Sequence, residues 1–344
     1  MPAFEGLAKL DPKLFGDRIA IVSTPSQRRL GRIEQACDAL GERAGTVFDE
    51  AAVHTPTSLR DRAERELRGA SGLVALGGGA AIGLSKALAV ALGLPYAAVP
   101  TTYSGSEMTP LYGVAEAGQK QVRRDARAQA RVVLYDPSLA LSLPAPVRRT
   151  SLINCLAHSL EVAWLSDASP LGLVVAAESC RSIAGCMGDV DRDAIDGRVA
   201  SELMLGAWLG GVALAISGTG LQHSLAHVIG GVTGASHAAI HTVVLPVVAR
   251  LNARATGPAQ QELTAALSPA ANGADGAGRA ARSIVSLLEL IYRRWELPQS
   301  LPDITDVRVS PGAVAERVLE EPAAARNLRS IDVEELRTML SEIC

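Results

Sequence analysis

The hydrophobic pattern of this chain changes once, near residue 144, and that change limits the folds open to it. Before it, short apolar runs of strand length, such as IAIVS at Ile19–Ser23, alternate with segments of helix length. After Leu143–Pro146, strand signals almost vanish and long segments of helical period follow one another. Alternating strands and helices are typical of a parallel sheet covered by helices. We therefore predict an α/β domain over residues 1–144 and an all-α domain over residues 145–344.

The expected elements follow from the same periodicity. In the first domain we expect strands at Ile19–Ser23, Thr46–Phe48, Gly72–Leu76, Tyr96–Val99 and Val132–Tyr135, and helical stretches at Gln27–Ala44, Ser58–Arg68 and Ala80–Leu92. In the second we expect helices at Thr150–Trp164, Leu171–Met187, Val199–Ile216, Leu221–Ile229, Thr242–Asn252, Gly278–Trp295 and Val333–Ile343. The segment Pro258–Gly278 is rich in Ala, Gly and Pro, and is expected to be a surface excursion.

Composition excludes several classes of protein. The net charge is −3, so no basic field predicts a nucleic-acid or membrane-surface partner, and aromatic residues at 3% disfavour a stacking platform. The five cysteines include no CxxC pair, which favours a reducing cytoplasm. The N-terminus carries charges where a signal peptide needs an apolar core. The longest apolar stretches, Ala87–Pro100 and Leu203–Ser217, are too short to span a bilayer, so we expect both to be buried core.

A glycine-rich turn follows one of the predicted strands. Gly77–Gly83 joins the strand at Gly72–Leu76 to a helix, although it is not a GxGxxG sequence. Glycines let a diphosphate approach the backbone, and a helix N-terminus presents N–H groups to it; a plain tight turn is the alternative. A second polar loop, Pro100–Glu107, follows the next strand at the same sheet edge. Together they predict a dinucleotide site whose candidate residues are Gly77, Gly78, Gly79, Thr101, Thr102, Ser104 and Ser106.

Histidines are concentrated in the second domain. Of six in the chain, four lie between His223 and His241, and the i,i+4 spacing that puts two side chains on one helix face occurs three times. The pairs are Asn154 with His158, His223 with His227, and His237 with His241. Converging imidazoles suit a divalent transition metal, a proton-transfer site or a cradle for an anionic substrate. Of these, the metal is the weaker interpretation, because no Asp or Glu joins the set and Asn is a poor ligand.

Several motifs resemble the iron-containing alcohol dehydrogenase family, in particular its maleylacetate reductase branch. They include VFDEAAVHTP, GGGAAIGLSKA, PTTYSGSEMTP, HSLAHVIGG, HTVVLP and NLRSIDVEELRTML, and they cover nearly the whole chain. The resemblance implies a Rossmann-like nucleotide-binding domain followed by an α-helical domain, the dehydroquinate synthase-like fold. It also implies hydride transfer from NADH or NADPH, in a cleft between the two domains. A homodimer is the implied assembly.

The resemblance also assigns roles to individual residues. The glycines and hydroxyls of the two loops match the family's cofactor-binding positions, and Lys120 matches a lysine near the ribose and nicotinamide. The positions of the family's metal ligands hold Asn154, His158, His223 and His237. His227 matches a histidine near the nicotinamide and is a candidate for the proton relay.

This chain departs from the branch at the positions that face substrate. Asn154 replaces the Asp ligand, so bound iron or zinc is doubtful, and we expect histidines rather than a metal to stabilise developing charge. The branch motifs HHKxCH and PHAETH read QHSLAH from Gln222 and SHAAIH from Ser236 here. Ser224 and Ala239 thereby replace a Lys and a Glu, and Ile240 departs as well. The catalytic candidates are His223, His227 and His241, with His227 or His241 as proton donor.

We therefore predict an NAD(P)H-dependent reductase of a small, carboxylate-bearing substrate. Lys120 and Arg124 are candidates to pair with that carboxylate or a cofactor phosphate, although a solvated basic patch explains the arginine equally well. His158 and His237 are further substrate candidates. Arg28 and Arg29 would tolerate the 2′-phosphate of NADPH. The alternatives are a non-redox cyclase or lyase on the same scaffold, and a ligand-binding protein that has lost catalysis.

Overall fold

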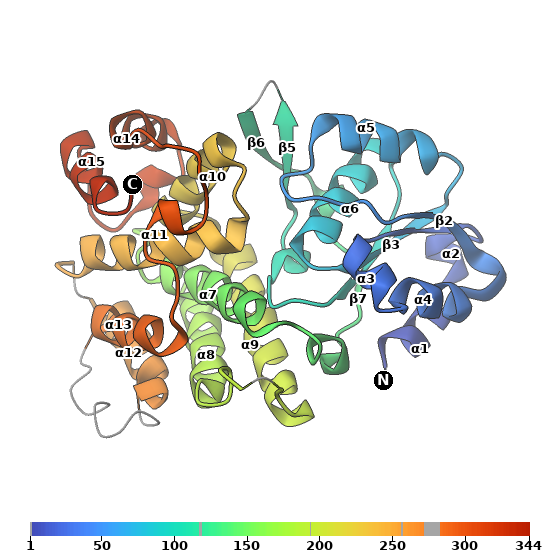
Figure 1. Cartoon of the computed structure of the whole chain (residues 1–344), viewed down its shortest axis with the longest axis horizontal. Helices are drawn as coiled ribbons and strands as arrows, with labels where there is room; N and C mark the ends of the chain where they lie inside the picture. The colour runs from blue at the N-terminus through green and yellow to red at the C-terminus, as the bar shows by residue number, and fades with distance from the viewer. Residues whose placement is uncertain (1, 117–118, 193, 256, 272–282) are drawn as a thin grey trace. The chain divides into compact units, whose positions relative to one another are not determined.

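The chain forms two compact units, Met1–Leu143 and Pro144–Cys344 (Figure 1). The computed structural model describes residues 2–116, 119–192, 194–255, 257–271 and 283–344; the side chains of 114–121 and 270–271 also lie outside the described part. The domain boundary expected between residues 144 and 145 lies one residue from the division between the units.

The first unit is built on a parallel sheet. Its strands, in sheet order, are β2 (Ala44–Phe48), β1 (Ile19–Val22), β3 (Gly72–Gly77), β4 (Tyr96–Pro100) and β7 (Val132–Val133). All four pairings between them are parallel. The carboxyl ends of β3 and β4 therefore lie at one edge, where Gly77 pairs with Pro100. This confirms the predicted α/β fold class.

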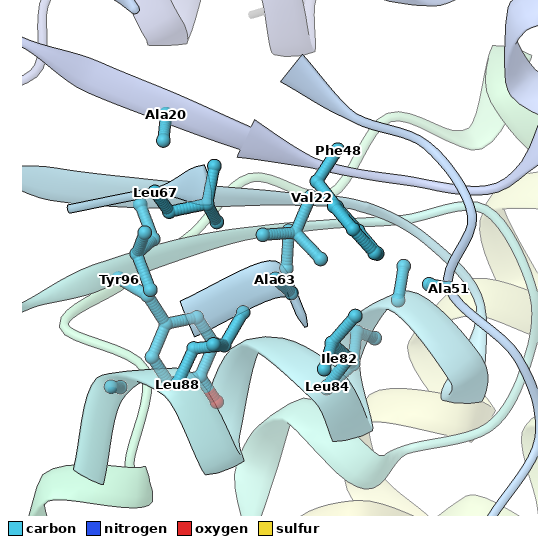
Figure 2. Packing of buried hydrophobic residues seen from close by; sticks show 14 of the residues in the cluster. Ala20, Val22, Phe48, Ala51, Ala63, Leu67, Ile82, Leu84, Leu88 and Tyr96 are labelled. Carbon is cyan, nitrogen blue, oxygen red and sulfur yellow. The ribbon is translucent and has the colours of Figure 1, made fainter. Parts of the chain in front are cut away.

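Helices cover both faces of this sheet. They are α1 (Ala3–Ala8), α2 (Pro12–Phe15), α3 (Pro25–Arg29), α4 (Arg32–Leu40), α5 (Thr57–Glu66) and α6 (Gly79–Leu92). Alternate strand residues point to opposite faces. Val22 and its same-face neighbours pack with α5 and α6, as Figure 2 shows around Phe48 and Ile82. Ile21 faces the other side and packs with α1, α2 and α4.

Two local features differ from expectation. The amphipathic stretch at Gln27–Ala44 contains two helices, α3 and α4, because Gly31 between them has a φ of 67°. An antiparallel hairpin of β5 (Leu111–Glu116) and β6 (Gln119–Arg124) was not predicted. Its sequence lacks the apolar alternation that indicates a half-buried strand. Short 3-10 turns also connect the elements, at η1 (Gly41–Arg43), η2 (Ser106–Met108), η3 (Ala126–Ala128) and η4 (Pro137–Ala140).

The second unit is helical in all its described longer elements, as predicted. They are α7 (Ala145–Val162), α8 (Pro170–Cys186), α9 (Gly197–Ser217), α10 (Leu221–Thr233), α11 (His237–Asn252), α12 (Pro258–Leu267), α13 (Ile284–Trp295), α14 (Pro311–Glu320) and α15 (Val333–Ser341). Short turns η5 (Ser268–Ala271), η7 (Leu301–Asp303) and η8 (Ala324–Arg326) lie between them. Every residue of α7 from Ser151 to Val162 is buried, and α7 contacts α8, α9, α10 and α11. Side chains on α7 therefore sit inside the helical core.

Two expectations for this unit need correction. Pro258–Gly278 is not simply a surface excursion, because it contains α12, which buries Leu263 and Leu267; residues 272–278 lie outside the described part. The length argument against a membrane span also fails, since the apolar helix begins at Gly197 and has 21 residues. Its apolar window is 56% buried in this unit, and α9 packs against α7 and α8. We interpret α9 as a core helix.

Candidate active site

The backbone of the glycine turn, Gly77–Gly79, can be approached closely by neighbouring groups. β3 ends at Gly77, which has a φ of 149°, and α6 begins two residues later. A Cβ on Gly78 would lie 2.7 Å from Thr102 Cγ2, so only glycine lets the two loops touch as they do. A Cβ on Gly79 would meet nothing within 4 Å. Among the described residues no side chain caps α6, so its N-terminal N–H groups suit a diphosphate.

The second predicted loop lies against this turn. The Thr101 amide donates to the Gly77 carbonyl at 3.1 Å, and Thr101 is buried. Thr102, Ser104 and Ser106 are partly exposed, so their hydroxyls border solvent. Gln27, which the sequence analysis did not single out, donates from Nε2 to Thr101 Oγ1 at 3.3 Å. The structure thus brings together the glycines and hydroxyls that were predicted to hold a cofactor.

A buried lysine supports the second loop from behind. Lys86 Nζ donates to Ser106 O at 2.5 Å, Thr109 Oγ1 at 3.0 Å and Leu111 O at 2.9 Å. Burial lowers the pKa of Lys86 to about 7, although the nearby Glu107 opposes this shift. Burial likewise raises the pKa of Glu107, which accepts a hydrogen bond from the Tyr135 hydroxyl at 2.7 Å. Neither Lys86 nor Glu107 was a sequence candidate.

The cationic side chains predicted to bind cofactor or substrate in this unit lie outside the described part, are exposed, or are already paired. The Lys120 side chain lies outside the described residues, and Arg124 is exposed at the end of β6. Arg28 already pairs with Asp49, and with Glu34 at 3.3 Å, which reduces its capacity to hold a 2′-phosphate. Asp49 follows β2 and was missed, because its proximity to Arg28 depends on the pairing of β1 with β2.

Five of the six histidines gather in the second unit. His158 comes from α7, His223 and His227 from α10, and His237 and His241 from α11. Ring centroids are 4.6 Å apart for His223 and His241, and 5.2 Å apart for His158 and His223. The side-chain clustering that the spacing predicted is therefore present. His54 lies in the other unit, between β2 and α5.

The cluster has a buried end and a more exposed end. His158, His223 and His241 are buried, and one ligand atom from each lies within 4.8 Å of the others. This buried group contains His241 where the predicted metal set has His237. His227 and His237 are only partly buried, and their rings stack at 5.4 Å with an interplanar angle of 11°. Solvent therefore reaches the cluster from the side of His227 and His237.

A buried carboxylate that the sequence analysis missed holds one of these rings. Glu161 Oε2 contacts Nδ1 of His223, and its Oε1 accepts the His223 backbone N–H at 3.1 Å. The carboxylate also caps the N-terminus of α10, where negative charge is favoured. Gly220 makes room for it, because a Cβ there would lie 3.1 Å from Glu161 Oε1. His223 Nε2 has no hydrogen-bond partner among the described residues, so it is available to a ligand or substrate.

A second contact selects the tautomer of His241. Gln222 Nε2 lies 2.9 Å from His241 Nδ1, and since an amide nitrogen only donates, Nδ1 accepts. Neutral His241 then carries its proton on Nε2, which lies 3.0 Å from His237 Nε2. The protonation of this pair thus follows from the orientation of the Gln222 amide. A hydrogen-bonded path therefore runs from buried His241 to partly exposed His237.

The side chains at the positions that depart from the family motif carry no charge and so add none to the histidine cluster. Asn154 is buried one turn before His158 on α7, with a neutral amide. The Ser224 hydroxyl donates to Gly220 O at 2.9 Å inside α10. Ala239 lies in the first turn of α11, and Ile240 is fully buried. The one acidic side chain that contacts the cluster through a described hydrogen bond is Glu161.

Comparisons with known proteins identify the family of this chain. Residues 3–137 match the family model for iron-containing alcohol dehydrogenase, and residues 149–344 match the C-terminal model of the Fe-containing alcohol dehydrogenase family. The chain belongs to the iron-containing alcohol dehydrogenase family. Within it, the chain is 36% identical to the maleylacetate reductase of Burkholderia cepacia over 325 residues, which are 94% of this chain and 88% of that protein.

Solved structures of the family support the same assignment. A putative alcohol dehydrogenase from Ralstonia eutropha JMP134 superposes with a TM-score of 0.87 at 34% identity, covering 99% of this chain and 93% of that one. The maleylacetate reductase of Agrobacterium tumefaciens gives 0.80 at 30% identity, with the same coverage. The chain is therefore an NAD(P)H-dependent oxidoreductase that resembles maleylacetate reductase. These relatives do not favour the cyclase, lyase and binding-protein alternatives.

Proposed function

We propose that this enzyme uses NADH or NADPH to reduce a small unsaturated oxo acid, of the kind named by its maleylacetate reductase relatives. The observation that carries the proposal is the buried pair of Glu161 and His223, in which His223 Nε2 has no hydrogen-bond partner among the described residues. Reduction of aromatic-ring breakdown products would be a fitting role. We further propose a cytoplasmic homodimer.

The cofactor would lie on the first unit. Gly77, Gly78 and Gly79 would hold its diphosphate with the N-terminus of α6, and Thr101, Thr102, Ser104 and Ser106 would donate hydrogen bonds from the adjoining loop. Lys120 is proposed for the ribose and nicotinamide side. Reduced nicotinamide supplies a hydride to an electron-poor carbon of the substrate.

The histidines would manage charge and protons. His223, with Glu161 behind it, would stabilise negative charge that develops on the substrate. His241 would supply the proton by way of His237: His241 Nε2 would pass its proton to His237 Nε2, 3.0 Å away, and His237 would pass the proton of its other ring nitrogen to the substrate. His227 stacks on His237 and is the alternative donor. The product gains one hydride and one proton, and the cofactor leaves oxidised.

The substrate carboxylate needs cationic or hydrogen-bonding partners, and this chain lacks the lysine that the branch motif contains. Because Ser224 stands where the branch has a lysine and bonds to its own helix, we propose His158, His237, Lys120 and Arg124 for this role. Fewer fixed cations bind a dianion less tightly. We therefore expect a monoanionic oxo acid to compete well with maleylacetate, measured as the ratio of their kcat/KM values.

A metal ion is the alternative source of charge stabilisation. Imidazoles of His158, His223 and either His237 or His241 fit iron or zinc by donor type, and such an ion would polarise the substrate oxygen. Asn154 lacks the negative charge of an Asp ligand, and both ring nitrogens of His241 have hydrogen-bond contacts. We expect elemental analysis of protein purified without chelator to give far less than one metal per chain. A full equivalent of iron or zinc would overturn this expectation.

The proposal is tested by mixing purified protein with NADH or NADPH and candidate oxo acids. Loss of the reduced-nicotinamide absorbance, dependent on both substrates, is the expected result. Absence of cofactor binding by calorimetry would contradict the proposal. Light scattering at the mass of one chain would contradict the homodimer.

Substitution of Gly78 tests the cofactor loops. In Gly78→Ala the new Cβ would meet Thr102 at 2.7 Å, so we expect a loss of about 1–3 kcal/mol of stability together with weaker NADH binding. Removing the γ atoms in Gly78→Ala/Thr102→Ala should restore most of the stability. Gly185→Ala on α8 is the control, because its Cβ meets nothing within 4 Å. Unchanged melting and NADH titration curves for Gly78→Ala would contradict the close approach.

A further inference from the structure

Lys86 is the only charged residue of α6, and its ammonium group is completely buried. Burying an ammonium group is unfavourable unless hydrogen bonds replace its water. Four oxygens do so here, since Ser106 Oγ lies 3.3 Å from Nζ in addition to the two carbonyls and the Thr109 hydroxyl. An ammonium has three N–H donors, so these oxygens account for all of them.

All four oxygens belong to one segment, which comprises the loop between β4 and β5 and the first residue of β5, Leu111. Ser106, Thr109 and Leu111 lie in its second half, whereas Thr101 and Thr102 in its first half touch the glycine turn. The glycine turn opens α6, and Lys86 lies on the same helix. One helix therefore fixes both cofactor loops, the first through its N-terminus and the second through the Lys86 side chain.

We propose that Lys86 is a positioning residue that holds the loop 101–111 at the distance from the glycine turn that NAD(P)H requires. The inference rests on the proposed nucleotide-binding role of both loops. Lys86 itself does not touch the cofactor in this arrangement; it acts through Ser106 and the backbone that carries Ser104. Without the ammonium, the segment loses the hydrogen bonds that tie its second half to the Lys86 side chain of α6.

The substitution Lys86→Met keeps the length of the side chain and removes its charge and donors. We expect faster hydrogen exchange at amides 101–111 in the cofactor-free protein, and a dissociation constant for NADH raised about tenfold by calorimetry. KM for NADH should rise likewise, with kcat nearly unchanged at saturating cofactor. Thr109→Val removes one acceptor only, and should shift the same measurements in the same direction by less.

Ser71→Ala is the stability control. It removes the hydroxyl that donates to Phe15 O at 2.9 Å and accepts the Arg18 N–H at 2.9 Å, just before the amino end of β3 and with no described contact to the loop 101–111. It should lower the melting temperature without changing the affinity for NADH. This comparison separates loss of stability from loss of loop position.

Each result of these measurements either supports or overturns the positioning role of Lys86. Wild-type exchange or wild-type NADH affinity in Lys86→Met overturns the inference, and if that variant does not fold, Thr109→Val decides on the same measurements. Equal loss of affinity in Ser71→Ala also overturns it, because the effect is then one of stability. If the wild-type protein binds neither NADH nor NADPH, the proposed function fails and takes the inference with it.

Discussion

Replacing Glu161 with glutamine is expected to lower kcat about 100-fold, with the fold retained. The carboxylate accepts two hydrogen bonds, from the His223 backbone N–H and from Nδ1. A glutamine amide accepts through its oxygen only, so one of these two donors would face an NH₂ group. In either orientation the amide is neutral, so the negative charge behind His223 is lost, and with it the support for a positively charged ring that offers Nε2–H to the substrate. Steady-state kinetics and thermal melting measure the two effects.

Glu178→Gln is the matched control for this substitution. Glu178 lies exposed on α8, where it pairs with Arg181 at 2.9 Å. Exposed pairs of this kind contribute at most about 1 kcal/mol, so kcat and melting temperature should stay near those of the wild type. A Glu161→Gln enzyme with wild-type kcat would show that the negative charge behind His223 does not limit the reaction.

The importance of Glu161 was not predictable from residue spacing. It follows His158 by three positions on an apolar helix, and its partner His223 is 62 residues away in the sequence. Spacing rules detect pairs on one helix, such as His237 and His241, but not a contact that depends on how α7 packs against α10. The statement that no acidic residue joins the histidines is therefore wrong at the level of the fold, although Glu161 supports a ring rather than adding a ligand to the buried group.

The secondary structure likewise includes elements that local sequence patterns predict and elements that depend on tertiary packing. Gly72–Leu76 was predictable as a strand because a short apolar run ends in glycines, and β3 has nearly these limits. Helix α12 was missed because its Ala and Gln residues carry little helical periodicity, and burial of Leu263 against the rest of the unit stabilises it instead. Likewise, Lys86 looks like an ordinary helix surface residue until β5 covers it. In both cases the feature depends on a tertiary contact, which local sequence patterns do not reveal.

Replacing His223 with alanine is expected to lower kcat at least about 1000-fold, and also to destabilise the protein. His223 is 3% exposed, and its removal leaves the Glu161 carboxylate buried with only the backbone N–H as a partner. A buried polar group that loses a partner costs about 1–3 kcal/mol, so we expect the free energy of unfolding to fall by about this amount. Chemical denaturation together with kinetics measures both losses.

A double-mutant cycle separates the two causes. Glu161→Leu alone leaves the His223 donors without an acceptor, whereas Glu161→Leu/His223→Ala removes both partners of the contact. If the pair interacts as the structure indicates, the double variant should lose less stability than the sum of the single losses, by about 1–3 kcal/mol. His227→Ala, at a partly buried ring, is the comparison and should change stability by less than about 1 kcal/mol. Additive losses in the cycle would mean that Glu161 serves α10 as a cap and not His223 as a partner, and the role of this pair in catalysis would then have to be abandoned.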